Sequence, residues 1–242
     1  IRIHKKSKNS ILDRAANFIE GLLYQKKNCY DREMILKNFV VFEGIDGTGT
    51  TSQLRLLQEA FASRGLADRV HFTCEPTGGA IGRLIREALS GAAEFDAKTV
   101  AYLFGADRCE HIYGKGGILE QLQAGKAVFS DRYLFSSLAY QGLAAGKDLA
   151  RAINAPFPLP EYLFFFDLPA KTAMERIEKR NIPREIYEKE TFQQKDAAEY
   201  QSIFQYYTET EPDMRIIRID AAQTIAEIHE KIWSNVCNLP II

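Results

Sequence analysis

Short apolar runs alternate with longer amphipathic stretches along the chain from residue 38 onward. The apolar runs are continuous, which is typical of strands that helices cover on both faces. They predict strands at Phe39–Glu43, Val70–Thr73, Ala127–Ser130, Tyr162–Asp167 and Arg215–Ile219. Helical spacing predicts helices near 51–64, 79–90, 97–124, 133–153, 170–180, 190–208 and 222–235. The alternation predicts an α/β fold, a three-layer sandwich around a central, mostly parallel five-stranded sheet.

The first 33 residues differ in pattern from the rest of the chain. They open on a basic cluster and continue with apolar residues at helical spacing. We expect an additional amphipathic helix that packs on the main domain or on a partner subunit. Contact with a membrane surface and a non-native start are the alternatives. The main domain is then expected to span residues 34–242.

Composition narrows the class of protein. The chain has 242 residues, 46% of them hydrophobic, and a formal net charge of −1, so it has no global basic field that would attract nucleic acid. Its four cysteines are scattered and form no CxxC pair, which favours reduced thiols and a cytoplasmic protein without structural zinc. No apolar run reaches the roughly 18 residues of a membrane span.

A glycine-rich turn follows the first predicted strand and precedes a helix. Its sequence is Gly44-Ile45-Asp46-Gly47-Thr48-Gly49-Thr50-Thr51, in which two glycines have the G-x-x-x-x-G spacing of a phosphate-binding loop. Glycines let the backbone curl around an anion, so that its N–H groups meet phosphate oxygens at the positive end of a helix. The turn therefore predicts binding of a nucleotide's phosphates, with the Thr51 hydroxyl placed to ligate magnesium.

The loop departs from its usual pattern at one position. A loop of this type normally has lysine where this chain has Thr50. That lysine neutralises charge on the β- and γ-phosphates, and losing one such donor typically lowers the rate by about 10²–10³-fold. Either another cation replaces it, or catalysis is weak or absent.

A dense basic run at the end of the helix predicted at 170–180 could supply that cation. It contains Arg176, Lys179, Arg180 and Arg184. One interpretation is a solvated helix end whose cations face the negative end of the helix dipole. We favour a mobile lid, about residues 178–192, that carries guanidinium groups onto the triphosphate.

Five segments in a fixed order resemble the thymidylate kinase family, nucleoside monophosphate kinases built on a phosphate-binding loop. They are Phe42–Gly49; Glu75–Gly79 with Gly82, Ile85 and Arg86; Phe104–Arg108 with His111; Asp131–Tyr133 with Ser136–Gly142; and Tyr187–Glu188 with Glu190–Phe192. The resemblance covers residues 39 to about 205 and leaves the N-terminal extension outside.

The resemblance implies a role for each matched position. Residues 44–51 would bind ATP, with Thr51 and Asp131 holding Mg²⁺. The catalytic residues would be Asp131, Arg132, Arg180 and Arg184. The acceptor site would contain Asp46 at the sugar 3′-hydroxyl, Glu75, Pro76, Phe104 stacked on the base, Arg108 and Arg132 on the acceptor phosphate, Ser136, Ser137 and Gln141 at the base edge, Tyr140 near the sugar 2′ position, and Tyr187 with Glu188 in the lid.

The implied reaction transfers a phosphoryl group from ATP to dTMP with Mg²⁺, in a homodimer that uses neither nucleic acid nor membrane. A general base is not required, because the acceptor phosphate is already an anion near neutral pH. Many family members have arginine where this chain has Cys74. Two alternatives therefore stay open, a kinase for another pyrimidine monophosphate and a nucleotide-binding protein with weak or no catalysis.

Overall fold

The computed structural model describes residues 35–179, 187 and 190–240. The predicted N-terminal helix, the proposed domain start at residue 34, and the lid residues Arg180, Arg184 and Glu188 lie outside this part of the chain.

Five parallel strands form one sheet in the order β2-β3-β1-β4-β5. The strands are β1 (Ile35–Glu43), β2 (Val70–Cys74), β3 (Ala127–Asp131), β4 (Leu159–Asp167) and β5 (Arg215–Asp220). Residues 39–43 of β1 are fully buried, as expected for a central strand covered on both faces. The edge strand β5 instead mixes charged and apolar residues, and only one of its six residues is buried. The predicted α/β sandwich is confirmed, and its sheet is parallel throughout the described residues.

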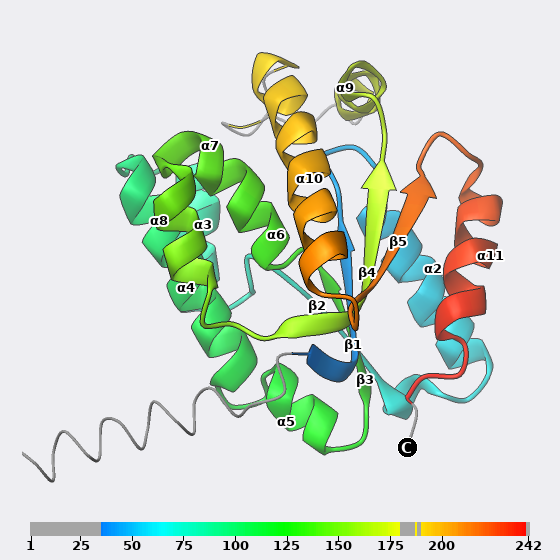
Figure 1. Ribbon diagram of the computed structural model, residues 1–242. Helices are drawn as coiled ribbons and strands as arrows, with labels where there is room; N and C mark the ends of the chain where they lie inside the picture. Colours follow the sequence, from blue (N-terminus) through cyan, green and yellow to red (C-terminus); the bar gives the residue numbers. More distant parts are fainter. Residues whose placement is uncertain (1–34, 180–186, 188–189, 241–242) are drawn as a thin grey trace, which may run out of the picture. The chain divides into compact units, whose positions relative to one another are not determined.

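Helices cover both faces of the sheet (Figure 1). They are α2 (Thr50–Ser63), α3 (Ala80–Leu89), α4 (Ala97–Tyr113), α5 (Ile118–Gln123), α6 (Leu134–Ser136), the π-helix η2 (Ser137–Gln141), α7 (Gly142–Ala145), α8 (Lys147–Asn154), α9 (Ala170–Glu178), α10 (Glu190–Thr210) and α11 (Ile225–Val236), with a short 3₁₀ turn η1 (Ala67–Arg69). In Figure 1, α2 and α11 lie on one side of the sheet, and α4 and α6 to α8 lie on the other.

Aromatic side chains pack the helices on both faces against the sheet. On one face, Phe61 of α2 contacts Phe129 of β3 at a ring distance of 5.6 Å and Trp233 of α11 at 5.1 Å. On the other, Phe204 of α10 contacts Phe165 of β4 at 4.0 Å. Burial of such large rings contributes about 1.5–3 kcal/mol each, so these contacts hold α2 and α10 against the sheet.

Two predicted helices are wrong in extent, and glycines explain both differences. The helix predicted at 97–124 divides into α4 and α5, because residues 114–117 form a turn in which Gly116 has φ 75°. The helix predicted at 133–153 begins at Leu134, contains a π turn and breaks at Gly146, where φ is 107°. A positive φ ends a helix and is readily adopted only by glycine.

Strand β1 begins earlier than the predicted Phe39. Ile35 and Leu36 already pair with Leu159 and Pro160 of β4, and the register then shifts before Val40. The polar Asn38, at φ 60°, occupies this irregularity, which interrupts the apolar pattern on which the prediction relied.

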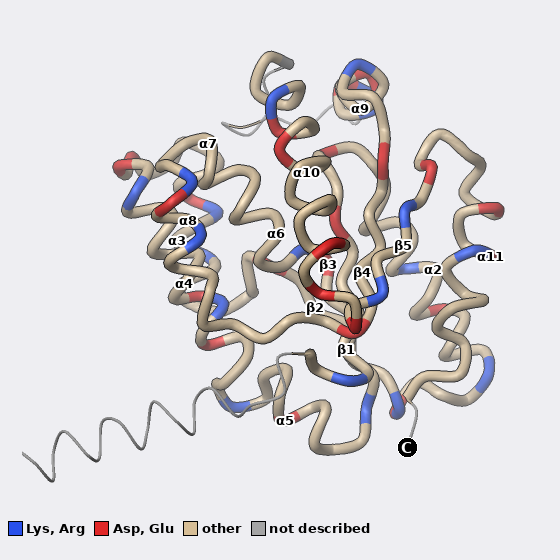
Figure 2. Tube along the Cα trace, in the orientation of Figure 1, with Lys and Arg blue, Asp and Glu red and all other residues tan. Residues whose placement is uncertain are grey.

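The described residues show how charged side chains, helices and thiols are distributed. Lys and Arg are interspersed with Asp and Glu along the helices (Figure 2). None of the helices in the described part is both long and apolar enough to cross a bilayer. Cys74, Cys109 and Cys237 are free thiols.

Candidate active site

The glycine-rich turn between β1 and α2 lies at the carboxyl edge of the sheet, where parallel α/β folds bind ligands. Gly47 and Gly49 have φ of 88° and 96°, a region that other residues enter only with strain. Gly49 caps α2 and offers no side chain to the first helical N–H groups. These N–H groups have no partner within the helix, so they are available to an anion.

Thr51 and Asp131 come together directly below this turn. The Thr51 hydroxyl donates a 2.5 Å hydrogen bond to Asp131 Oδ2. Strand pairing sets this contact, because Asp131 is the last residue of β3 and lies opposite Phe42 of β1. The predicted metal pair is thus side by side.

The pair has the chemistry of a magnesium site. Asp131 Oδ1 is buried and has no hydrogen-bond partner among the described residues, so its lone pairs are not used by the protein. The described residues contain no cluster of three or more His, Cys, Asp or Glu. Mg²⁺ is commonly held in this way, by one or two protein oxygens together with substrate phosphates and water. Thr51 and Asp131 fit that pattern.

Arg132 connects the turn to the acceptor side of the site. Its guanidinium donates to the Gly44 carbonyl at 3.0 Å, to the Ser136 hydroxyl at 3.1 Å and to Asp46 Oδ1. Its backbone has φ 70°, a strained value for a residue with a side chain. These contacts hold the guanidinium beside the loop.

The Glu43 side chain is hydrogen-bonded to residues that follow β3 and to a residue of α10. It is completely buried. One carboxylate oxygen accepts from the backbone N–H groups of Tyr133 and Ser136 at 2.8 and 3.1 Å, and the other accepts from the hydroxyls of Ser136 and Tyr200 at 2.7 and 2.9 Å. A single carboxylate therefore joins β1, the turn after β3, and α10.

Burial raises the pKa of Glu43 to about 7, although Arg132 and the donated hydrogen bonds lower it. Between pH 4.5 and 7, the folded protein therefore keeps a proton on Glu43 that the unfolded chain, with a pKa near the ordinary 4.5, releases.

Ionisation of the buried Glu43 lowers the free energy of unfolding of the wild type as the pH rises through this range. We expect the free energy of unfolding of Glu43→Gln to gain about 3 kcal/mol relative to that of the wild type between pH 4.5 and 7.5. Urea unfolding across this range measures the difference, with exposed Glu59→Gln as the control. Parallel pH profiles for the wild type and Glu43→Gln would contradict the expectation.

A second buried cluster lies deeper on the acceptor side. Arg108, 1% exposed, pairs with Glu75 Oε2 at 2.6 Å and also donates to Ser137 and Asn154. Burial raises the pKa of Glu75, but Arg108 and His111 outweigh it and the net pKa is lowered. Glu75 is thus an anion that holds Arg108 in place.

Comparison with known proteins agrees with this geometry. The sequence model of the family described as "Thymidylate kinase" matches residues 42–232. The chain belongs to the thymidylate kinase family. It is 49% identical to a Treponema pallidum (strain Nichols) protein named "Putative thymidylate kinase", over 82% of this chain and 94% of that one. It is 38% identical to a Pyrococcus horikoshii protein named "Probable thymidylate kinase", over 80% of this chain and 93% of that one. The chain is therefore an enzyme of the nucleoside monophosphate kinase type.

The thymidylate kinase site brings most of the residues predicted from sequence into two neighbouring groups. The loop residues, Thr51, Asp131, Arg132, Ser136, Tyr140 and Asp46 form one group, and Glu75, Arg108 and Ser137 form the other. Phe104 is half-buried one helical turn before Arg108 on α4. Arg108 and Arg132 have separate hydrogen-bond partners, so their joint action on one phosphate stays a prediction.

Within the predicted lid, the described Tyr187 packs against the rings of Tyr140 and Phe192. The Tyr187 ring lies 5.6 Å from that of Tyr140 and 4.9 Å from that of Phe192. Burial raises the pKa of the Tyr187 hydroxyl, against a smaller lowering effect of Gln141. Arg176 of the basic run lies in α9 (Ala170–Glu178), before the predicted lid, and donates to the Ala221 carbonyl at 2.9 Å. It lines a hollow of about 350 Å³ together with Gly47, Thr48, Gly49 and Gln223.

Sequence reasoning missed several residues of this site. Asp107 accepts from the Thr77 backbone at 2.7 Å and hydroxyl at 2.6 Å, and so holds the 75–79 turn. On α10, Gln193 donates to Asp46, Tyr200 donates to Glu43, and Asp196 is buried between them in the sequence. Their helical spacing, as a polar stripe on an otherwise apolar buried face, is the signal that could have revealed them.

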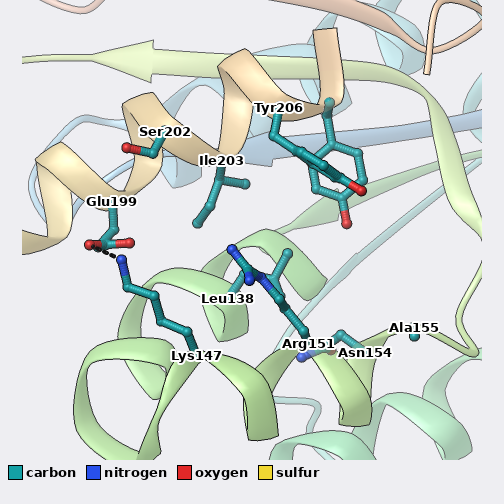
Figure 3. Close-up of a pocket in the computed structure, with 10 residues that line it drawn as sticks. Leu138, Lys147, Arg151, Asn154, Ala155, Glu199, Ser202, Ile203 and Tyr206 are labelled. Carbon is teal, nitrogen blue, oxygen red and sulfur yellow. Dashed lines mark hydrogen bonds and ion pairs between the residues drawn. The ribbon is translucent and has the colours of Figure 1, made fainter. Parts of the chain in front are cut away.

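A separate hollow of about 400 Å³ lies between α8 and α10, away from the loop (Figure 3). Lys147 and Glu199 pair across it at 2.7 Å, and Arg151 and Tyr206 also line it. Asn154, at its base, donates to the Ala150 carbonyl and accepts from Arg108.

Proposed function

We propose that the chain catalyses the Mg²⁺-dependent transfer of the γ-phosphoryl group of ATP to dTMP, giving dTDP and ADP. The Thr51–Asp131 pair at the mouth of a phosphate-binding loop carries this proposal, together with membership of the thymidylate kinase family. A cytoplasmic location and a homodimer belong to the proposal as the family implies them.

Each part of the described site has a task in this reaction. The loop amides and the N-terminus of α2 bind the donor phosphates. Arg132 binds the acceptor phosphate, since its planar fork matches two phosphate oxygens. An oxygen of that phosphate attacks the γ-phosphorus, while the bond from this phosphorus to the bridging oxygen of ADP breaks. Mg²⁺, when bound, would neutralise charge on the donor phosphates.

The protein needs no group that removes a proton, because the acceptor phosphate is ionised near neutral pH. Its contribution is to align two anions and to hold charge against them. Asp131 orients the metal ligands, and the buried Glu43 keeps the turn that carries Arg132 in register with the loop.

The site has Thr50 where a loop of this type normally has lysine, so another cation has to supply the positive charge on the triphosphate. We propose that Arg180 and Arg184, with Arg176, bring positive charge to the triphosphate when the lid closes. Arg176 supports this role, since it lines the hollow beside Gly47 and Gly49. The binder without catalysis stays the rival, because Thr50 and Cys74 both lack the charge found in many relatives.

An assay of ADP release with ATP, Mg²⁺ and a panel of nucleoside monophosphates tests the proposed function. We expect dTMP to give the highest kcat/KM, ahead of dUMP, dCMP and the ribonucleotides. Highest activity with another pyrimidine monophosphate would reassign the acceptor. Binding of ATP and dTMP by calorimetry without release of ADP would favour the non-catalytic binder.

A further inference from the structure

His111 of α4 is hydrogen-bonded through both nitrogens of its ring. Nδ1 lies 3.0 Å from Glu75 Oε1, and Nε2 lies 2.7 Å from the hydroxyl of Thr73 on β2. The side chain is buried, so water does not compete for these contacts. The phosphoryl transfer itself does not use His111, yet His111 contacts the carboxylate that holds Arg108.

The two partners of His111 determine where the proton of the ring lies. Burial raises the pKa of Glu75, but Arg108 and His111 outweigh it, and the net pKa is lowered. Glu75 is therefore an anion, and a carboxylate only accepts hydrogen bonds. Nδ1 of His111 then carries the proton and donates to Glu75. Nε2 of the neutral ring is an acceptor, and the Thr73 hydroxyl donates to it.

His111 determines which oxygen of Glu75 is left for Arg108. An arginine and a carboxylate often pair as two forks, in which each carboxylate oxygen accepts from a different nitrogen. In this structure Oε1 accepts from His111. Oε2 alone accepts from Arg108, at 3.0 Å from Nε and 2.6 Å from Nη2. The guanidinium is therefore held by one oxygen, in an orientation that the histidine sets.

Arg108 has one N–H group that the protein does not use. A guanidinium has five N–H donors. Glu75 accepts from Nε and Nη2, Ser137 accepts from Nη2, and Asn154 accepts from Nη1. The second N–H of Nη1 has no partner among the described residues. The direction of this N–H depends on how Glu75 holds the guanidinium.

We propose that His111 is a positioning residue for the acceptor, which occupies one oxygen of Glu75 and thereby directs the unused N–H of Arg108 at the bound acceptor. This inference rests on the proposed function, in which Arg108 belongs to the acceptor site. Without the imidazole, Glu75 Oε1 would be buried without a donor. An unpaired buried oxygen costs free energy, so the carboxylate would turn both of its oxygens to Arg108. The unused N–H would then no longer face the acceptor.

Loss of His111 should act on acceptor binding rather than on the transfer step. Arg132 and the glycine-rich loop have hydrogen-bond partners that are separate from those of Arg108. The ATP site and the residues beside the transferred phosphoryl group are therefore unaffected. A change that is confined to binding raises KM and leaves kcat nearly unchanged.

The first test compares three substitutions of His111 in an assay of ADP release at varied dTMP. We expect His111→Ala to raise the KM for dTMP about tenfold or more and to lower kcat less than about threefold. The KM for ATP should not change. The amide nitrogen of Asn takes the place of Nδ1 and can donate to Glu75, so His111→Asn should keep the KM within about threefold of the wild type. The amide of Gln takes the place of Nε2, next to Thr73, so His111→Gln should resemble His111→Ala.

The second test asks whether His111 acts through Arg108. In the Arg108→Lys background no planar fork remains to be oriented, so His111→Ala should raise the KM for dTMP less than about twofold further. The control is Glu110→Ala, an exposed position on the same helix, which should match the wild type.

Two results would overturn the role of His111. One is the same KM for His111→Asn and His111→Gln at equal melting temperatures, which would make the contact merely structural. The other is an undiminished effect of His111→Ala in the Arg108→Lys background. If His111→Ala does not fold, the comparison of the Asn and Gln variants still decides the matter.

Failure of the proposed function gives a different pattern. Dissociation constants for dTMP from calorimetry should rank the variants in the same order as KM, because His111 acts on binding. If the wild type binds dTMP without release of ADP, the proposed function fails, and this ranking still supports or overturns the role of His111. Absence of dTMP binding overturns both.

Discussion

Replacement of Asp131 by Asn is expected to lower turnover of dTMP by about 10²–10³-fold. The amide keeps the size of the side chain and an oxygen that can accept from Thr51, but it removes the negative charge and the free Oδ1. Binding of Mg²⁺ with the nucleotide should weaken, so that half-maximal activity needs a much higher Mg²⁺ concentration. Binding of ATP in EDTA should change little, because the loop amides hold the phosphates.

A Mg²⁺ titration of ADP release, paired with calorimetry of ATP in EDTA, measures both effects. The control is Asp213→Asn, an exposed carboxylate between α10 and β5. An Asp131→Asn enzyme with wild-type turnover and an unchanged Mg²⁺ requirement would remove Asp131 from the metal site.

Loss of the lid arginines is the second change with a large expected effect. The combined variant Arg180→Ala, Arg184→Ala should lower kcat by about 10³-fold or more, since arginines that stabilise transferring phosphate contribute on this scale. The dissociation constant for ATP should change much less. ATP binding should change less than kcat because the N–H groups of the loop bind the phosphates of ATP before the reaction. Thr50 carries no charge, so the loop does not neutralise the negative charge that develops in the transition state.

A restored lysine makes this prediction specific. Thr50→Lys should raise the kcat of the double arginine variant by tenfold or more, because an ammonium group at that position would supply the missing charge. In the wild type it should change kcat little. The matched control is Arg55→Ala. Arg55 is exposed on α2 and forms an ion pair with Glu59. Full activity after loss of Arg176, Arg180 and Arg184 together would exclude the compensating lid.

The fold could be predicted from sequence because its strands are continuous apolar runs. Val40, Val41 and Phe164 lie in strands that are buried on both sides. In such strands burial selects apolar residues at every position, so the hydrophobic pattern alone reveals the strand. The pattern failed where the backbone took a positive φ. Gly116 lies in the turn between α4 and α5, and Gly146 ends α7. The apolar periodicity from which these helices were predicted does not register backbone dihedrals.

The proximity of Thr51 and Asp131 follows from strand pairing, whereas their role as magnesium ligands stays a prediction. Asp131 ends β3, and parallel pairing with β1 places it beneath the turn that leads to Thr51. The residues that support the site from α10 could not be found in this way. Tyr200 reaches Glu43 across 157 positions of sequence, and such a contact depends on how a helix is rotated about its axis. Ser136 shows the same limit. The resemblance implied a place at the base edge, but the Ser136 hydroxyl is hydrogen-bonded to Glu43 and Tyr200.

The contact between α2 and α11 gives the protein a built-in optical reporter. The sequence has one tryptophan, and this Trp233 contacts Phe61 near the end of α2 and lies under the Arg64 guanidinium at 4.3 Å. Indole emission from the unmodified chain therefore reports a single place, the far end of the helix that begins at the phosphate-binding loop.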